Sequence, residues 1–199
     1  MARQNKSTLK PGSSTLRIIG GRWRGRKLLF PAVEGLRPTP DRVRETLFNW
    51  LQTTIGGTRC LDLFAGSGAL GFEAASRGAD KVILVEQNRQ AVDQLRNHVQ
   101  TLSAIQCSVV KQSAQQYLLG DPDPFDVVFI DPPYSADLWT ECAQQLVQGG
   151  WLKKGTQIYL ECPRRNTLPE LPEQWDLVRE KVAGDIKYYL FVNQADKNL

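Results

Sequence analysis

Cys60-Leu61-Asp62-Leu63-Phe64-Ala65-Gly66-Ser67-Gly68-Ala69-Leu70-Gly71 is the stretch that decides the fold of this chain. It passes from an apolar run, typical of a buried strand, through glycines into the start of a helical pattern. Its last six residues fit the pattern G-x-G-x-x-G, and Glu86 lies twenty residues beyond Gly66. Glycines let the backbone approach a ligand closely, and a carboxylate after the second strand can bind ribose hydroxyls. The stretch therefore predicts a nucleoside-binding site.

Downstream of this stretch, short apolar runs alternate with amphipathic helical patterns. Strands are predicted at 60–64, 81–86, 107–110, 125–130 and 157–161, with helices between them. Such alternation indicates a parallel sheet with helices on both faces. The last two runs, 177–182 and 186–192, are separated by three residues, too few for a crossover helix, so they must form an antiparallel hairpin. We expect a Rossmann-like α/β fold with seven mostly parallel strands, the sheet plan of class I methyltransferases that use S-adenosylmethionine.

A second informative stretch, Asp131-Pro132-Pro133-Tyr134, follows the apolar run 125–130. Proline has no backbone N–H, so the strand must end here and the carbonyls of the turn are left for another partner. An acid, free carbonyls and a flat aromatic side chain suit a planar group that carries an NH2, such as a nucleobase amine. A rigid exit from the strand is the alternative. In the functional interpretation, all four residues form the catalytic site.

Two cofactor classes fit the glycine loop. A dinucleotide is the literal interpretation, but Asp62 would then face its phosphates. The carboxylate instead suits the cationic amino group and sulfonium of S-adenosylmethionine, and only a methyl donor also uses the 131–134 stretch. The expected cofactor-binding residues are Arg37, Thr39, Asp62, Phe64, Ala65, Gly66, Ser67, Gly68, Glu86, Gln87, Ser113 and Ala114, of which the last two follow the third strand where an adenine ring would lie.

Bulk composition excludes several other classes. The chain of 199 residues has 41% hydrophobic and 23% charged residues, which is ordinary for a globular protein. No stretch approaches the roughly eighteen apolar residues of a membrane span, and the polar start lacks the core of a signal peptide. The four cysteines form no C-x-x-C pair and the single histidine is far from them, so we expect no metal site, reduced thiols and a cytoplasmic protein.

Charge is unevenly distributed along the chain, although the net charge is only +4. Residues 1–37 hold nine Lys or Arg and one acid, whereas the remainder holds 16 Lys or Arg and 20 acids. A basic arm on an acidic body indicates that the arm binds a polyanion, with a merely solvated tail as the alternative.

The arm itself contains LRIIGGRWRGRKLLF at 16–30, which predicts a β-hairpin with glycine turns. Four cations surround Trp23. Cations neutralise phosphates and an aromatic ring can stack on a base, the usual combination for single-stranded RNA. The expected RNA-binding residues are Arg17, Arg22, Trp23, Arg24, Arg26, Lys27 and Arg42.

A helix is predicted from Thr39 to Leu51, where apolar residues recur at helical spacing. Thr39 is a suitable N-cap, Pro40 fits the first helical position and Asp41 complements the helix dipole. Arg37 and Thr39 precede this helix in a loop that could fold over a ligand. Capping alone also explains Thr39.

The segments RIIGGRWRGRKL, GLRPTPDRVRETLFNWL, LDLFAGSGALGFEA and DPPY occur in this order over residues 17–134. Together they resemble RsmD, a bacterial family of small-subunit ribosomal RNA guanine-N2 methyltransferases, and the resemblance runs from about 16 to 192. It implies S-adenosylmethionine as the donor and a guanine of 16S ribosomal RNA as the target, in a small subunit or its assembly intermediate. Together with the composition and the strand pattern, it predicts a disordered basic lead-in (1–15), a β-hairpin arm (16–38) and a methyltransferase domain (39–199). Ser113 departs from the Asp or Asn often found there in related enzymes.

The chemistry expected from this resemblance is methyl transfer to the guanine N2. Hydrogen bonds from the amine to the Asp131 carboxylate and the Pro132 carbonyl would aim its lone pair at the methyl group. Tyr134 would stack on the base through its ring, so Tyr134→Phe is expected to retain most activity. Two alternatives stay open: adenine-N6 methylation of RNA or DNA, and a non-catalytic RNA-binding protein with a nucleotide site.

Overall fold

Seven strands form the central sheet of the protein, whose computed structural model describes residues 13–31 and 39–195. The sheet order is β5-β4-β3-β6-β7-β9-β8. The first five strands in this order run parallel, β9 is antiparallel to β7, and β8 is antiparallel to β9. This confirms the predicted sheet plan. The strands are β3 (Arg59–Asp62), β4 (Lys81–Glu86), β5 (Cys107–Lys111), β6 (Phe125–Ile130), β7 (Leu152–Pro163), β8 (Trp175–Ala183) and β9 (Ile186–Asn193).

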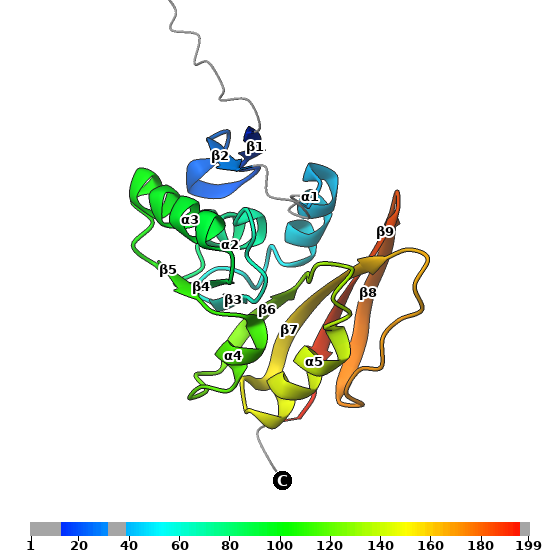
Figure 1. Cartoon of the computed structure of the whole chain (residues 1–199). Helices are drawn as coiled ribbons and strands as arrows, with labels where there is room; N and C mark the ends of the chain where they lie inside the picture. The colour runs from blue at the N-terminus through cyan, green and yellow to red at the C-terminus, as the bar shows by residue number, and fades with distance from the viewer. Residues whose placement is uncertain (1–12, 32–38, 196–199) are drawn as a thin grey trace, which may run out of the picture.

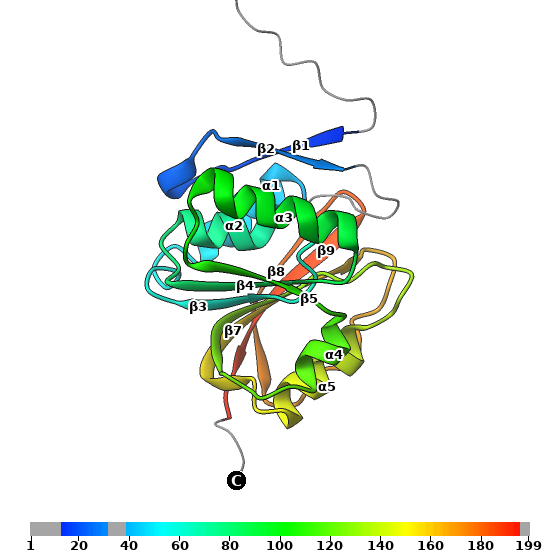
Figure 2. The ribbon, with the colours of Figure 1, turned by 60° about the vertical axis from the view of Figure 1, so that its left-hand side comes forward.

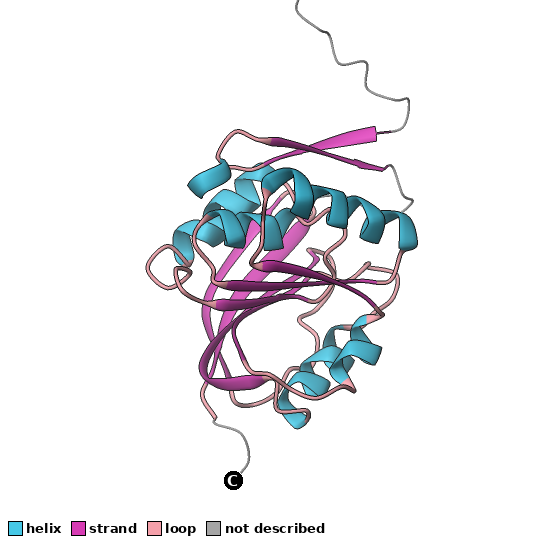
Figure 3. Cartoon of the chain, turned by 90° about the vertical axis from the view of Figure 1, so that its left-hand side faces the viewer, coloured by secondary structure: helices cyan, strands magenta, loops and turns pink. Residues whose placement is uncertain are grey.

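Helices cover both faces of this sheet, as Figures 1 and 3 show. One face carries α1 (Asp41–Trp50), α2 (Ala69–Ser76) and α3 (Arg89–Leu102), and the other carries α4 (Ala114–Leu118) and α5 (Trp139–Gln148). Within residues 13–31 and 39–195, no helix has the length and apolar character needed to cross a membrane.

A separate two-stranded sheet lies outside the layer of α1, α2 and α3 (Figure 2). It consists of β1 (Ser13–Arg17) and β2 (Lys27–Pro31), which pair antiparallel, and the turn of 3-10 helix η1 (Gly21–Trp23) lies between them. Gly21 has a φ of 70°, and a Cβ there would lie 1.8 Å from the carbonyl oxygen of Ser76. Glycine at this position therefore lets the hairpin rest directly on the end of α2. The predicted N-terminal β-hairpin is confirmed.

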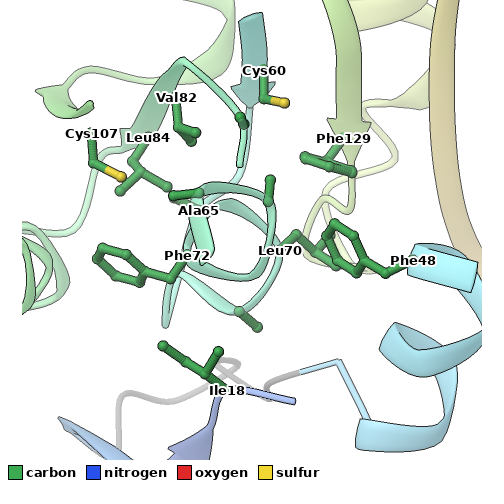
Figure 4. Close-up of a cluster of buried hydrophobic side chains, with 14 of the residues drawn as sticks. Ile18, Phe48, Cys60, Ala65, Leu70, Phe72, Val82, Leu84, Cys107 and Phe129 are labelled. Carbon is green, nitrogen blue, oxygen red and sulfur yellow. The ribbon is translucent and has the colours of Figure 1, made fainter. Parts of the chain in front are cut away.

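Two hydrophobic cores lie on the two faces of the sheet. Successive residues of β3 alternate between them, with Cys60 in one cluster and Leu61 in the other. Figure 4 shows the first core, in which Phe72 of α2 lies between the sheet residue Leu84 and Ile18 of the arm. The arm is thus part of the first core, and its burial explains why it adopts a fixed position.

Three element boundaries differ from the predicted ones. α1 begins at Asp41 with Pro40 as its N-cap, because the side chain of Thr39 bonds elsewhere. β7 starts before 157 and continues to Pro163, because β9 pairs with it up to that residue. α5 begins at Trp139 rather than near 136, since Asp137 has a left-handed φ of 47° that a helix cannot include.

Candidate active site

Four loops meet at the carboxyl edge of the parallel strands. The glycine loop follows β3, and the loops after β4, β5 and β6 begin next to Glu86, Lys111 and Ile130. β3 is the central strand of this group, with β4 on one side and β6 on the other. The connection after β3 runs through α2 on one face of the sheet and that after β6 runs through α5 on the other, and open α/β sheets bind ligands in the crevice at such a switch point. The structure therefore brings the predicted nucleoside loop next to the predicted reaction centre.

Glycines of the loop after β3 occupy positions that side chains would block. Gly66 and Gly68 have φ values of 51° and 80°. A Cβ at Gly68 would lie 2.5 Å from the ring of Phe72, and one at Gly71 would lie 2.2 Å from Leu84. The loop thus presents bare backbone at the start of α2, and Ala65 and Ser67 are buried beside it.

Glu86 holds the end of β4 against this loop. One carboxylate oxygen accepts the N–H of Gly66 at 2.9 Å, and the other accepts the N–H of Asn88 at 2.7 Å. The side chain is half-buried, and each oxygen has a further lone pair. Its place after β4 fits the predicted ribose contact, while the neighbouring Gln87 is exposed.

Asp62 lies beneath α2 rather than at the mouth of the loop. Its carboxylate accepts the N–H of Gly71 at 2.9 Å, and the residue is 2% exposed. Burial raises its pKa to about 7, with a smaller contribution from the charge of Glu86. This geometry does not support the predicted direct contact with a cofactor amino group. Asp62 instead fixes α2, and with it the glycine loop, while Phe64 at the end of the strand is half-buried.

Ser113 begins α4 through a capping box. Its hydroxyl accepts the N–H of Gln116 at 3.2 Å, and its own N–H donates to the Gln116 side chain at 3.4 Å. Ala114 behind it is buried. Because the hydroxyl already caps the helix, an adenine contact at this loop would rest on shape and backbone rather than on the serine side chain.

Asp131 lies at the end of β6, as predicted, and receives a bond from Thr39. The hydroxyl of Thr39 donates to the Asp131 carboxylate at 3.3 Å, so Thr39 lies at the predicted reaction centre and does not cap α1. Burial raises the pKa of Asp131 well above its usual range, and the nearby charges of Glu161 and Asp62 raise it further. Of the two prolines that follow, Pro132 is buried and Pro133 is exposed.

Tyr134 is 42% exposed, and its ring stacks on that of Trp139 with centroids 6.3 Å apart. Its hydroxyl donates to Glu161 at 2.8 Å. The sequence prediction missed Glu161, a buried acid near the end of β7 whose other oxygen accepts the hydroxyl of Tyr159 at 2.7 Å. An acid at the end of an otherwise apolar strand was the signal that could have identified it.

Trp23 does not occupy the place predicted for it. The side chain is 6% exposed and belongs to the core beneath the hairpin, and the backbone N–H of Trp23 donates to the Ser76 hydroxyl at 2.9 Å. A buried ring cannot stack on a base, so the expected RNA contact of Trp23 is corrected. The loop folds inward here because η1 packs against α2.

The cations of the arm remain on the surface. Arg22, Arg24 and Lys27 are exposed. Arg17 pairs with Asp41 at 3.2 Å, and Arg26 donates to the carbonyl of Thr101 at 3.4 Å. Arg42 is exposed on α1, and Arg37 lies outside the described residues.

A buried acid on α2, Glu73, attaches the arm to the body. Its carboxylate accepts the N–H groups of Ile19 and Gly20, both at 2.8 Å, and pairs with Arg44 at 3.3 Å and Arg77 at 2.8 Å. Arg44 is 1% exposed and also donates to the carbonyl of Thr39 at 3.2 Å. Sequence reasoning missed both residues of this buried pair, which connect the arm to the residue that contacts Asp131.

Comparisons with known proteins agree with this geometry. The family model described as Conserved hypothetical protein 95 matches residues 16–192. The Escherichia coli (strain K12) protein named Ribosomal RNA small subunit methyltransferase D is 48% identical over 184 residues, covering 92% of this chain and 93% of that protein. The solved structure of Escherichia coli yhhF has a TM-score of 0.87 at 45% identity, covering 92% of this chain and 100% of that chain.

A more distant solved structure shares the fold. It is an RNA methyltransferase from Salinibacter ruber in complex with S-adenosyl-L-homocysteine, with a TM-score of 0.62 at 15% identity. The similarity covers 80% of this chain and 95% of that chain. The similarity shows a shared fold.

Proposed function

Because the chain belongs to the Conserved hypothetical protein 95 family, as the match over residues 16–192 shows, we propose that it is an S-adenosylmethionine-dependent ribosomal RNA methyltransferase. We further propose that its target is the N2 amine of a guanine in 16S ribosomal RNA. The relative that shares 48% of its residues carries the name Ribosomal RNA small subunit methyltransferase D, which supports the reaction class and the RNA. The family resemblance inferred from the sequence is thereby confirmed.

The observation that carries the proposal is the juxtaposition of two loops. Asp131 directly follows β6, which pairs with β3, and the glycine loop follows β3. A donor held by that loop and an amine held at Asp131 would thus be neighbours at one edge of the sheet. The exposed ring of Tyr134 beside Asp131 offers a surface on which a base can stack.

The residues at this edge fit a cationic nucleoside donor. The bare backbone around Gly66 and Gly68 allows close approach, and Glu86 is the last residue of β4, where ribose hydroxyls would lie. The carboxylates of Asp62, Glu86 and Asp131 all lie near this edge, and negative charge stabilises a positive ligand. When bound, S-adenosylmethionine would supply an electrophilic methyl group on a positively charged sulfur.

Asp131 would act on the amine rather than on the donor. A guanine N2 lone pair is delocalised into the ring, so it is a weak nucleophile. A hydrogen bond from the amine to the Asp131 carboxylate, and one to the Pro132 carbonyl, would hold the lone pair out of the ring plane. Orientation of this kind contributes up to roughly 7–11 kcal/mol in good intramolecular models. Asp131 or water would take the proton that the amine releases.

We propose that the substrate is a small ribosomal subunit or its assembly intermediate in the cytoplasm. The exposed arginines of the arm would neutralise RNA phosphates on the face that carries α1, α2 and α3. The target base would leave its neighbours to reach Asp131, as it does in enzymes that modify the edge of a base.

Label transfer from tritiated S-adenosylmethionine tests this function. The protein is incubated with 16S ribosomal RNA and, separately, with isolated small subunits from cells that lack the enzyme, followed by digestion to nucleosides. We expect labelled N2-methylguanosine from at least one substrate. Labelled N6-methyladenosine would favour the adenine alternative, and no label in either RNA would favour a non-catalytic RNA-binding protein.

A further inference from the structure

Glu161 lies beside the proposed reaction centre on the neighbouring strand. β6 and β7 run parallel, and Ile130 pairs with Leu160, so the next residues, Asp131 just after β6 and Glu161 within β7, lie at the same level of the sheet. Glu161 is 3% exposed. It is therefore a buried acid at the edge where the acceptor amine would bind.

Glu161 contacts the loop between β6 and α5 through two different groups. Its carboxylate accepts the hydroxyl of Tyr134 at 2.8 Å, and its backbone carbonyl accepts the indole N–H of Trp139 at 2.7 Å. Tyr134 and Trp139 also stack on each other. One residue of β7 thus holds both aromatic rings that follow Asp131.

The rest of that loop is open to solvent. Pro133, Tyr134, Ser135, Ala136 and Asp137 are all exposed, and within the loop the N–H of Ala136 bonds the carbonyl of Pro133 at 2.9 Å. A single backbone bond of this kind does not fix a side-chain ring. The contacts with Glu161 and Trp139 therefore set the orientation of the Tyr134 ring.

A buried carboxylate at this position is unfavourable for the stability of the folded protein. Transfer of a charged group into the protein interior is unfavourable, and hydroxyl donors compensate only part of that free energy. Burial raises the pKa of Glu161, against the opposing effect of the two tyrosine hydroxyls. An apolar side chain would fill the same space more favourably, which argues for a functional reason.

We propose that Glu161 is a positioning residue that anchors the Tyr134 ring by its hydroxyl, so that the ring is already in place when the acceptor base stacks on it. This rests on the methyl transfer proposed above. The anchored hydroxyl also argues against the sequence expectation that Tyr134→Phe retains most activity. Displacement of a reacting group by about 1 Å can lower turnover about 100-fold.

Four variants test this hydrogen bond between Glu161 and the Tyr134 hydroxyl, which we call the anchor. The measured activity is methyl transfer to ribosomal RNA. Glu161→Met removes both acceptor oxygens at similar size, whereas Glu161→Gln keeps one oxygen for the Tyr134 hydroxyl. We expect Glu161→Met to lower kcat by about 10- to 100-fold with the affinity for S-adenosylhomocysteine within about twofold, and Glu161→Gln to restore most of the loss. Tyr134→Phe should lower kcat comparably, and the double variant with Glu161→Met should be no worse than the poorer single variant.

Tyr189→Phe is the matched control, because it removes a hydroxyl from a buried tyrosine of β9 that bonds Lys187 instead of Glu161. It should leave kcat unchanged. Wild-type turnover in Glu161→Met, or losses that multiply in the double variant, would overturn the anchor. Should Glu161→Met fail to fold, wild-type turnover in Tyr134→Phe overturns it equally.

Hydrogen exchange separates failure of the anchor from failure of the proposed function. Amides of residues 134–139 should exchange faster in Glu161→Met than in the wild type, and no faster in Tyr189→Phe. The hydrogen-exchange measurement does not depend on methyl transfer. Unchanged exchange overturns the anchor, whereas absence of methyl transfer by the wild type overturns only the proposed reaction.

Discussion

Acidic residues are concentrated at the carboxyl edge of the sheet. Asp62, Glu86, Asp131 and Glu161 lie at or near the ends of four neighbouring strands. Burial raises the pKa of Asp62, Asp131 and Glu161, and their mutual repulsion adds to the shift of Asp131. Such a concentration of carboxylates is unfavourable for the protein alone, and a cationic donor would relieve it.

Asp131 gives the most direct test of the proposed chemistry. We expect Asp131→Ala to lower methyl transfer at least about 100-fold, because the amine loses the acceptor that aims its lone pair. The affinity for S-adenosylhomocysteine, measured by calorimetry, should stay within a few-fold. Asp137→Asn, at an exposed acid of the same loop, is the control and should transfer normally. Normal turnover in Asp131→Ala would exclude the assignment.

Asp62 should make stability depend on pH. Its pKa rises from an ordinary 3.8 to about 7 in the folded protein. Between these values the folded state keeps a proton that the unfolded chain has lost, so the free energy of unfolding should fall as pH rises through this window, by about 1.4 kcal/mol per pH unit at most. Urea unfolding of Asp62→Asn should show a flatter fall than the wild type. Asp80→Asn, at an exposed acid, should match the wild type.

At the scale of elements, the hairpin and α1 depend on the middle of α2. Glu73 of α2 bonds two backbone N–H groups of the arm and pairs with Arg44 of α1. Arg44 also bonds the carbonyl of Thr39, whose side chain reaches Asp131. The element that carries the exposed cations is therefore connected to the reaction centre through one buried ion pair.

Removal of Glu73 should release the arm. Glu73→Ala leaves the buried guanidinium of Arg44 without that carboxylate, and loss of one partner from a buried pair destabilises by about 3–5 kcal/mol. Thermal unfolding should move to lower temperature, and trypsin should cleave faster at Arg22 and Arg24. Glu45→Ala on the exposed face of α1 is the control. Unchanged cleavage would show that the core contacts alone hold the hairpin.

The arm cations should account for part of the salt dependence of RNA binding. We expect replacement of Arg22, Arg24 and Arg26 by alanine to reduce the slope of log K against log salt by about 0.7–0.9 for each phosphate that the variant no longer neutralises. Filter binding between low and physiological salt measures this slope. Lys153→Ala, near the beginning of β7, is the control. An identical slope in the triple variant would remove the arm from the RNA interface.

At the scale of the whole molecule, the donor site is formed by loops from several strands, so donor binding should stabilise the entire sheet. A ligand at 100 times its Kd adds about 2.7 kcal/mol to the free energy of unfolding. S-adenosylhomocysteine should therefore raise the unfolding temperature, and NAD at the same concentration should not. The opposite order would favour the dinucleotide interpretation of the glycine loop.

Much of the fold was predictable because its signals are local. Runs such as Phe125–Ile130 and Lys81–Glu86 are apolar throughout most of their length, and the glycine loop and Asp131 directly follow strands. Since parallel strands end at one edge of a sheet, adjacency in the sequence placed these groups together. The short turn between the last two strands likewise required an antiparallel pair.

The sequence by itself thus determined the sheet plan, the glycine loop and the acid at the end of β6. Only the tertiary structure decided that Trp23 is buried, that Thr39 contacts Asp131 and that Glu161 holds Tyr134. The physical reason is sequence separation: the last two pairs join residues 92 and 27 positions apart. Whether a polar group meets solvent or a buried partner depends on which element packs over it, and no local pattern contains that information.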